Sequence, residues 1–455
     1  MNCQGFIKQK LISHIKETLR LALPSAIARA GIVTMGVVDT VMVSRYSTME
    51  LAYFGISNSI VMLLVVVIIS LTTGIPVVCS QEYGAGNYKR CLETWFSSLP
   101  YCIIIGLISI VVCFFADKIL ILSGQDYDIA EKAGDVSKVF AYSFPFIIIY
   151  VCSAGFLEGI KRPSYAMVVI FVANLFNVFF NWVFIYGKFG FKPMGAVGAS
   201  WATVVNRGVV AFLMLAYILP MMKGHNFNWK HAFRVFDKKN QKMRRIGYGA
   251  AFSKGSEVIA FFIVTMFAGY LGTMALATFS IANNLIGFFY MISAGFAAAA
   301  TVRVGIAAGR KDSCDVAFAG WTALFVNLGI MLVLSFFVNA LSEPITAVYT
   351  KDVELIPMAK KVIDFAGWII IVNGGQFIAA SALRGRGDVL IPAIIQALCS
   401  LVLMSVGAWV LAFNLGLGVT GLLFGMMIAN FIATIILAAR FSYLSKKDSL
   451  SETFL

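Results

Sequence analysis

The chain has 455 residues, of which 60% are hydrophobic and only 13% are charged, and its mean hydropathy is +0.87. Its apolar residues come in runs of about 20, the length that crosses a bilayer as a helix. This composition excludes an ordinary water-soluble protein. It predicts an all-α polytopic membrane protein that has the lipid bilayer as a partner.

The net charge of +14 does not predict nucleic-acid binding, because the basic residues lie in short segments between apolar runs. The chain has three histidines, all in basic polar segments, and eight cysteines without a CxxC pair. It contains no Walker loop, GxSxG, HExxH or dinucleotide fingerprint. We therefore expect a protein that is not an enzyme and has no cofactor. An intramembrane enzyme, a receptor and a channel are weaker alternatives.

Polar residues, glycines and prolines divide the chain into twelve apolar spans, and each is predicted to form a transmembrane helix. In chain order the spans cover residues 21–44, 51–79, 94–116, 138–159, 164–187, 196–221, 247–270, 274–302, 318–341, 362–383, 389–413 and 418–440.

Alternating the loops across the membrane places most of the lysines and arginines on the side of the N-terminus. These are Lys89, Arg90, Lys161, Arg162, the basic residues of 223–245, Arg303, Arg310, Lys311, Arg384, Arg386, Lys446 and Lys447. The opposite loops carry acids or no charge. Because cytoplasmic loops are enriched in basic residues, both termini are predicted to be cytoplasmic.

The two halves of the chain resemble each other in sequence. The pattern of residues 48–58 recurs 225 positions later at 273–283, and that of 157–159 recurs 226 positions later at 383–385. A constant offset over about 150 residues indicates duplication. We expect two pseudo-symmetric six-helix bundles around a central cavity. The predicted parts are an N-lobe at 1–222, a basic cytoplasmic linker at 223–245 and a C-lobe at 246–455.

The first span carries a carboxylate, Asp39, in its second half. An aspartate at the centre of a membrane helix costs roughly 2.5–3.5 kcal/mol on insertion scales, and such acids usually face a protein interior or a watery cavity. Asp39 is therefore a candidate ion or proton site. The alternative is a structural acid whose hydrogen bonds are satisfied within the bundle.

Three asparagines of the fifth span, Asn174, Asn177 and Asn181, have a spacing that aligns them on one helix face. Three amides in a stripe are typical of a polar cavity wall, although they can also be contacts between helices. Amide oxygens beside a carboxylate suit a hard monovalent cation such as Na⁺. The same groups can instead hydrogen-bond a protonated Asp39.

In the seventh span, Lys254 and Glu257 are three residues apart, which allows an ion pair within the helix. Glu257 is either a second coupling residue or part of a structural pair. Arg29 is about 15 Å along the helix from Asp39, too far for direct pairing, and must have another partner or snorkel. Arg29 and Arg207 either line the cavity or have a structural role.

Motifs in both halves of the chain, in the same order, resemble the multidrug and toxic compound extrusion (MATE) family, most closely its bacterial NorM-type branch. The resemblance covers about residues 21–440. In the first half it rests on Pro24, VVDTVMVSR at 37–45, TGIPVVCSQEYGAGN at 73–87, LEGIKRP at 157–163 and 177–203. In the second half it rests on Glu257, LGTMALA at 271–277, FYMISAGFAAAATVRVG at 289–305 and ALRGRGD at 382–388.

The resemblance implies a V-shaped transporter of the MOP superfamily. It also implies an N-lobe cation site made of Asp39, Asn177, Asn181 and Thr203. The equivalent C-lobe positions are Glu257, Tyr290 and Asn373. Asn373 departs from the aspartate of the NorM branch and cannot carry a charge or exchange a proton, so coupling is expected at Asp39. Phe288, Phe289 and Met291 are candidates for the wall of a substrate cavity.

The function implied by the resemblance is efflux of amphipathic, mostly cationic compounds in exchange for Na⁺ or H⁺, by a monomer in the inner membrane. The residues do not decide between the two coupling ions. A lipid-linked oligosaccharide flippase of the same superfamily is the nearest alternative. Such a protein needs a cationic cavity for pyrophosphate, which Arg29 and Arg207 would supply.

Overall fold

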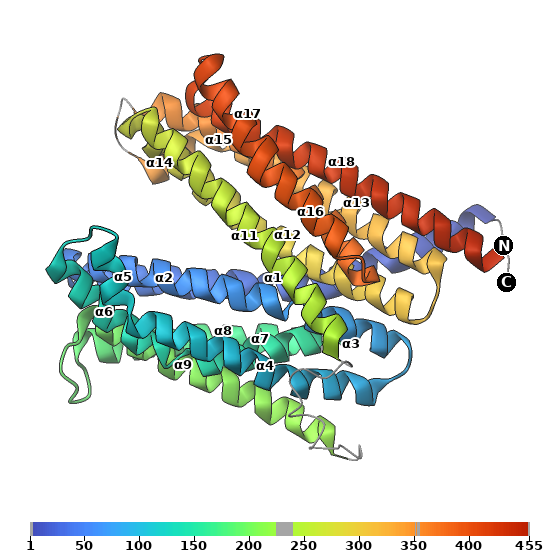
Figure 1. The fold of residues 1–455 in the computed structure, drawn as a ribbon, viewed down its shortest axis with the longest axis horizontal. Coiled ribbons are helices and arrows are strands. Elements are labelled where there is room, and N and C mark those ends of the chain that lie inside the picture. The colour runs from blue at the N-terminus through green and yellow to red at the C-terminus, as the bar shows by residue number, and fades with distance from the viewer. Residues whose placement is uncertain (1–2, 224–239, 351, 353–354, 454–455) are drawn as a thin grey trace. The chain divides into compact units, whose positions relative to one another are not determined.

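The computed structural model describes residues 3–223, 240–350, 352 and 355–453. Within these residues the chain forms helices and no strands, which confirms the predicted fold class (Figure 1). Residues 224–239, which make up most of the predicted basic linker, lie outside the described part of the chain.

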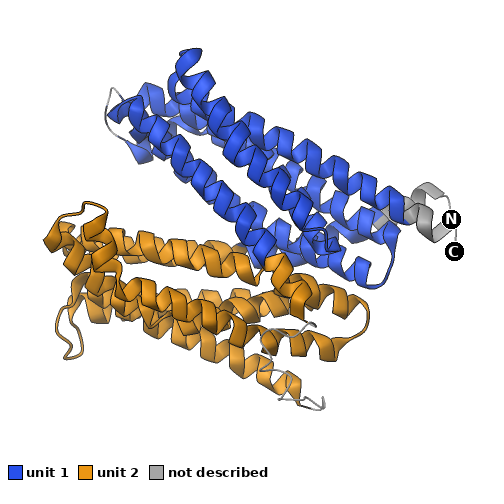
Figure 2. Ribbon diagram, in the orientation of Figure 1, with its two compact units in different colours: residues 1–26, 248–455 blue, residues 27–247 orange. Residues whose placement is uncertain are grey.

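The chain forms two compact units, which Figure 2 shows in different colours. Unit 1 consists of residues 1–26 and 248–455, and unit 2 consists of residues 27–247. Helix α1, Cys3–Tyr46, contributes its first part to unit 1 and its second part to unit 2. The first turns of α1 therefore belong to the core of the second half of the sequence.

Within its described residues, unit 2 contains the rest of α1, the first residues of α11 (Gln241–Tyr270) and eight further helices. They are α2 (Thr48–Thr72), α3 (Gly74–Gly84), α4 (Tyr88–Phe114), α5 (Ala116–Leu122), α6 (Tyr127–Ala141), α7 (Phe144–Gly159), α8 (Pro163–Tyr186) and α9 (Gly195–Ile218), followed by the short turn η1 (Leu219–Met222). Helix α9 packs against α6, α7 and α8. Asp126 caps α6 through a hydrogen bond from the backbone N–H of Asp128, as is usual for an N-cap aspartate.

Unit 1 contains most of α11 (Gln241–Tyr270) and the helices that follow it. They are α12 (Thr273–Gly309), α13 (Ser313–Ala340), α14 (Ser342–Tyr349), α15 (Leu355–Arg386), α16 (Leu390–Leu398), η3 (Cys399–Met404), α17 (Ser405–Trp409), η4 (Val410–Asn414) and α18 (Gly418–Thr453). Helix α15 packs against α12, α13 and α18 and lies at the centre of this unit. Leu21 and Ala22 of α1 complete a buried cluster with Phe296 and Ala300 of α12.

The order of helices repeats with the offset predicted from the sequence. Helices α2 and α12 begin 225 residues apart, and so do α4 and α13. The copies differ in continuity: α2 and α3 are separated at Thr73, whereas α12 is one helix over the same length. Pro76 follows this break and lacks the N–H that a continuous helix needs there.

Ten helices among the described residues are long and apolar enough to cross a membrane, or eleven if α6 and α7, bent by 49°, form one span. The span predicted at 362–383 is helical within α15 but is not among them. The protein is a multi-pass membrane protein.

Candidate functional site

Asp39 lies on α1 within unit 2, is only 6% exposed and has a hydrogen-bond donor within reach of each carboxylate oxygen. The amide nitrogens of Asn177 and Asn181 donate to Oδ1 at 2.9 and 2.6 Å. The Thr203 hydroxyl has one proton, which it donates either to Oδ2 at 3.4 Å or to the Ala199 carbonyl at 3.0 Å. The four residues predicted to form the first-half site are therefore in contact with one another.

Helices α8 and α9 position the partners of Asp39. Asn177 and Asn181 are one turn apart on α8, so both amides project from the same face. Gly198 lets α9 pack closely against α8. A Cβ at this position would lie only 2.6 Å from the carbonyl oxygen of Phe184. Gly187, with φ of +67°, ends α8 in the left-handed conformation that glycine adopts without strain.

Asn174 has a different role from the other two amides of the predicted stripe. Its side-chain nitrogen donates to the carbonyl oxygens of Gly31 at 3.2 Å and of Ile170 at 2.8 Å. It joins α8 to the backbone of α1 two turns before Asp39. Asn174 thus forms the contact between helices that was the alternative to a cavity wall, since the helical period fixes the shared face but not the partner.

The amides present N–H groups to the carboxylate, which is the orientation that stabilises an ionised Asp39. Among the described residues, the buried Oδ1 atom of Asn181 has no hydrogen-bond partner. Rotation of a side-chain amide exchanges its nitrogen and oxygen with little change in shape. The same four residues can therefore surround an anionic carboxylate, or direct oxygen atoms towards a cation beside it.

Each of the two arginines that the sequence left without a partner has one in unit 2. Arg29 forms an ion pair with Glu158 on α7, with an Nη2 to Oε1 distance of 3.2 Å. Arg207 donates from Nη1 to the Ser143 hydroxyl at 2.6 Å, and its charge attracts that of Asp39. Arg207 is one turn from Thr203 on α9. The first-half site thus has an arginine as a neighbour.

In unit 1, Lys254 and Glu257 form the predicted ion pair, with Nζ 3.0 Å from Oε2. The same ammonium lies 3.2 Å from the Tyr290 hydroxyl and 4.5 Å from the centroid of its ring. Lys254 therefore joins two of the three second-half candidates. Nearby, Gln396 accepts hydrogen bonds from Ser253 at 2.6 Å and Arg384 at 2.8 Å.

The remaining candidates of the second half lie on α12 and α15. Asn373 is half-buried one turn before Phe377, whose ring packs against Tyr290 with centroids 4.9 Å apart. Phe288 is 59% exposed, and Phe289 packs edge-on against it at 5.4 Å while contacting the core of unit 1. Met291 is half-buried on the same helix. Their role in a substrate cavity stays a prediction.

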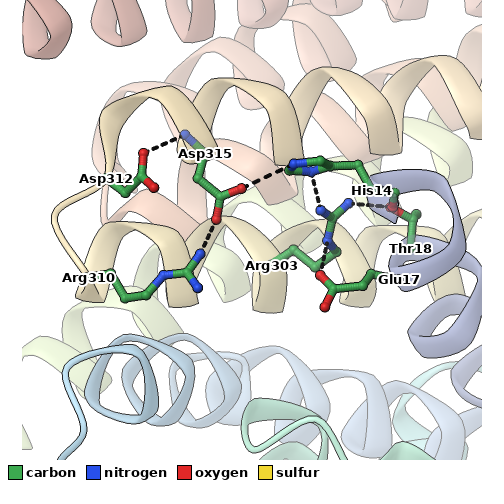
Figure 3. Close-up of polar contacts among 7 residues, drawn as sticks. All are labelled: His14, Glu17, Thr18, Arg303, Arg310, Asp312 and Asp315. Atoms are coloured by element: carbon green, nitrogen blue, oxygen red, sulfur yellow. Dashed lines mark hydrogen bonds and ion pairs between the residues drawn. The ribbon is translucent and has the colours of Figure 1, made fainter. Parts of the chain in front are cut away.

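A buried polar network in unit 1, which the sequence did not predict, joins α1 to α12 and α13 (Figure 3). Arg303 donates to the His14 carbonyl at 3.0 Å and the Thr18 hydroxyl at 2.5 Å, and pairs with Glu17 at 3.6 Å. Arg303 also contacts Nδ1 of His14. Because a guanidinium only donates, Nδ1 must accept, and His14 Nε2 lies 3.4 Å from Asp315. Asp315 in turn contacts Arg310.

The assignment of Arg303 and Arg384 to loops was therefore wrong. Both lie within long helices and are only 5% and 9% exposed. Counting charges located both arginines near the end of a predicted span. It could not show that they are buried, because an arginine side chain extends several ångströms from its backbone. A usable signal was the apolar sequence around Arg303, Val302 on one side and Val304 on the other, which continues the helix past the predicted span.

The MatE family model matches residues 24–183 and 250–410 of this chain. The chain belongs to the MatE family. The two matched segments correspond to the two copies of the repeat. Asp39 and both asparagine partners lie in the first match, and Lys254, Glu257 and Tyr290 lie in the second. The predicted resemblance to the MATE family is confirmed.

Curated relatives in bacteria match this MatE protein over most of its length. It is 29% identical over 446 residues to the "Probable multidrug resistance protein NorM" of Caulobacter vibrioides, covering 96% of this chain and 93% of the relative. It is 28% identical to the multidrug resistance protein MdtK of Photorhabdus laumondii, with 84% of each chain covered. The crystal structure of a MATE protein in complex with MaD3S has the same fold, with a TM-score of 0.88, 19% identity, and coverage of 96% of this chain and 97% of the other.

Proposed function

We propose that this protein is a secondary active multidrug efflux transporter that exports amphipathic organic cations in exchange for Na⁺ or H⁺. The names of its NorM and MdtK relatives support multidrug transport. The observation that carries the coupling is the buried carboxylate of Asp39, in contact with two amides and a hydroxyl inside a membrane helix bundle. An intramembrane acid with such partners is the usual device for ion-driven transport.

The Asp39 site offers a way to respond to the coupling ion. Without an added cation, the two amides and Thr203 stabilise the carboxylate as an anion. An entering Na⁺ would bind the carboxylate and amide oxygens, including the unpartnered Oδ1 of Asn181, whereas a proton would neutralise Asp39 directly. Either ion drives export only if it binds one orientation of the transporter more tightly than the other.

The proposed location is the inner membrane of a bacterium, with both termini in the cytoplasm and the protein acting as a monomer. The basic residues that remain at helix ends, such as Lys161 and Lys311 in the turns after α7 and α12, support this orientation. Substrates would then enter from the cytoplasmic side.

Efflux of ethidium and of norfloxacin from a pump-deficient bacterial strain tests the proposal. Cells that produce the protein should retain less of both compounds than cells with an empty vector. Varying Na⁺ at constant pH, and pH at constant Na⁺, identifies the coupling ion. Equal retention with and without the protein, under every combination of Na⁺ and pH, would contradict the proposed efflux.

Replacing Asn181 by alanine is expected to weaken ion coupling. The change removes the shortest hydrogen bond to Asp39 and the unpartnered amide oxygen. A hydrogen bond to a charged group is worth roughly 1.5–3 kcal/mol, so the Na⁺ or H⁺ concentration for half-maximal efflux should shift by roughly tenfold or more. Asn174→Ala is the matched control, because in the described part of the chain the Asn174 side chain donates to backbone carbonyls and not to Asp39. Equal shifts in both variants would contradict a specific role for Asn181.

Lipid-linked oligosaccharide flipping is the competing function, and it requires arginines that can bind pyrophosphate. Arg29 is instead paired with Glu158, and Arg207 is bonded to Ser143 near Asp39, which favours drug efflux. A flipping assay with purified protein in liposomes discriminates the two. Translocation of a lipid-linked oligosaccharide without ethidium transport would support the flippase.

A further inference from the structure

Lys254 occupies a place in unit 1 that has the chemistry of a cation-binding site. A carboxylate, a phenol hydroxyl and the face of an aromatic ring surround its ammonium, at 3.0, 3.2 and 4.5 Å respectively. These groups come from two helices, because Glu257 is on α11 and Tyr290 is on α12. Carboxylates and aromatic faces together are the groups that bind organic ammonium ions.

The ammonium is held near the middle of its helix. Lys254 is 13 residues from the beginning of α11 and 16 from its end, so it lies roughly 20 Å along the helix from either end. A lysine at such a depth is costly unless it is paired. The two contacts to Glu257 and Tyr290 satisfy most of its three donors, which explains how this residue is tolerated there.

The site remains partly accessible and is bordered by a second cation. The side chains of Lys254 and Glu257 are 28% and 24% exposed. Arg384 lies close enough for its charge to act on both Glu257 and Tyr290, but it is 9% exposed and hydrogen-bonded to Gln396. Arg384 is thus fixed in place, whereas Lys254 has a flexible four-carbon stem that can move away from its partners.

We propose that Lys254 is a built-in cation that occupies an organic-cation site formed by Glu257 and Tyr290. An external organic cation binds to this site only by displacing the lysine ammonium. Lys254 therefore sets how tightly the second half of the protein binds cationic substrates. This inference rests on the proposed efflux of organic cations and identifies the residue that limits their affinity.

Equilibrium binding of ethidium to the purified full-length protein in detergent, followed by fluorescence at pH 8, tests the role of Lys254. Lys254→Gln removes the competing charge, so the Kd for ethidium should fall by at least about tenfold. Lys254→Arg keeps a cation and should leave the Kd within about twofold of the native value. An unchanged or higher Kd in Lys254→Gln would overturn the proposal.

Two further variants test whether a gain in ethidium affinity in Lys254→Gln arises at this site. Adding Glu257→Gln to Lys254→Gln should abolish the gain in affinity, because the carboxylate is then absent. Lys360→Gln is the matched control: Lys360 pairs with Glu343 at 2.5 Å, but the two side chains are 41% and 77% exposed. This surface pair lowers the pKa of Glu343 through the hydrogen bond and the positive charge of Lys360. A gain in Lys360→Gln as large as that in Lys254→Gln would show a general charge effect and contradict the proposal.

Glu257→Gln alone decides the question if Lys254→Gln does not yield monodisperse protein. In the native protein the lysine already occupies Glu257, so this variant should change the ethidium Kd by less than about twofold. A tenfold or greater loss of ethidium affinity would mean that the ligand binds Glu257 without competition from Lys254, and would overturn the proposal. The outcome is separable from that of the proposed function, because efflux dependent on Asp39 can persist whether or not Lys254 limits binding.

Discussion

Asp39→Asn is expected to reduce ion-coupled ethidium efflux to the level of cells that lack the protein. Asparagine has nearly the same shape as aspartate and can keep hydrogen bonds with Asn177, Asn181 and Thr203. It cannot carry a negative charge or release a proton at physiological pH. Because Asp39 is the acid at the centre of the first-half site, its neutralisation should remove the response to both Na⁺ and H⁺.

Efflux of ethidium from energised cells, normalised to the amount of protein in the membrane, measures this effect. Asp135→Asn is the matched control, since Asp135 is a half-exposed acid of α6 that pairs with Lys138 at 3.1 Å. It should leave efflux near the native rate. Efflux by Asp39→Asn at the native rate, with normal protein levels, would refute the coupling role of Asp39.

Replacing Arg303 by methionine is expected to lower the free energy of unfolding by about 3–5 kcal/mol, the cost of breaking a buried charged network. Its guanidinium is nearly inaccessible and joins His14, Glu17 and Thr18 of α1 to α12. Methionine fills similar space but leaves the His14 carbonyl and the Thr18 hydroxyl without this donor. The first part of α1 should then detach more readily from unit 1.

Unfolding of the purified protein in detergent, by heat or by denaturant, measures the loss for Arg303. Arg310→Met is the matched control, because Arg310 contacts Asp315 but its side chain is 50% exposed. Exposed pairs of this kind contribute about 0–1 kcal/mol. If both variants were destabilised by the same amount, the buried network would not hold α1 in place.

The helices and their repeat could be predicted because both depend on local sequence. Eleven of the twelve predicted spans lie, to within a residue at their ends, inside one helix or two consecutive helices, and 389–413 covers the consecutive segments α16, η3, α17 and η4. Hydropathy and turn residues act over short distances, which is why they locate the helices. The 225-residue offset needed only a comparison of the chain with itself. The span predicted at 362–383 is likewise helical, within α15 at the centre of unit 1, although α15 is not among the ten helices counted as long and apolar enough to cross a membrane.

The first-half site was accessible to sequence reasoning through two independent signals. An acid in an apolar helix needs partners, and the spacing of Asn177 and Asn181 places two amides on one face. The resemblance to the MATE family supplied Thr203, on a third helix. Glu257 and Lys254 were paired correctly for a similar reason, because their spacing on one helix limits how far apart they can be.

By itself, the sequence determined the membrane class, the duplicated helix order, the family and the acid on which coupling is proposed to depend. Only the tertiary structure decided which partners the polar residues have: the backbone of α1 for Asn174, Tyr290 for Lys254, and Glu158 for Arg29. Arg303 and His14 are 289 positions apart and are joined only when α1 packs against α12. Helical periodicity defines which residues share a face, whereas the helix in contact with that face depends on the packing of the whole bundle.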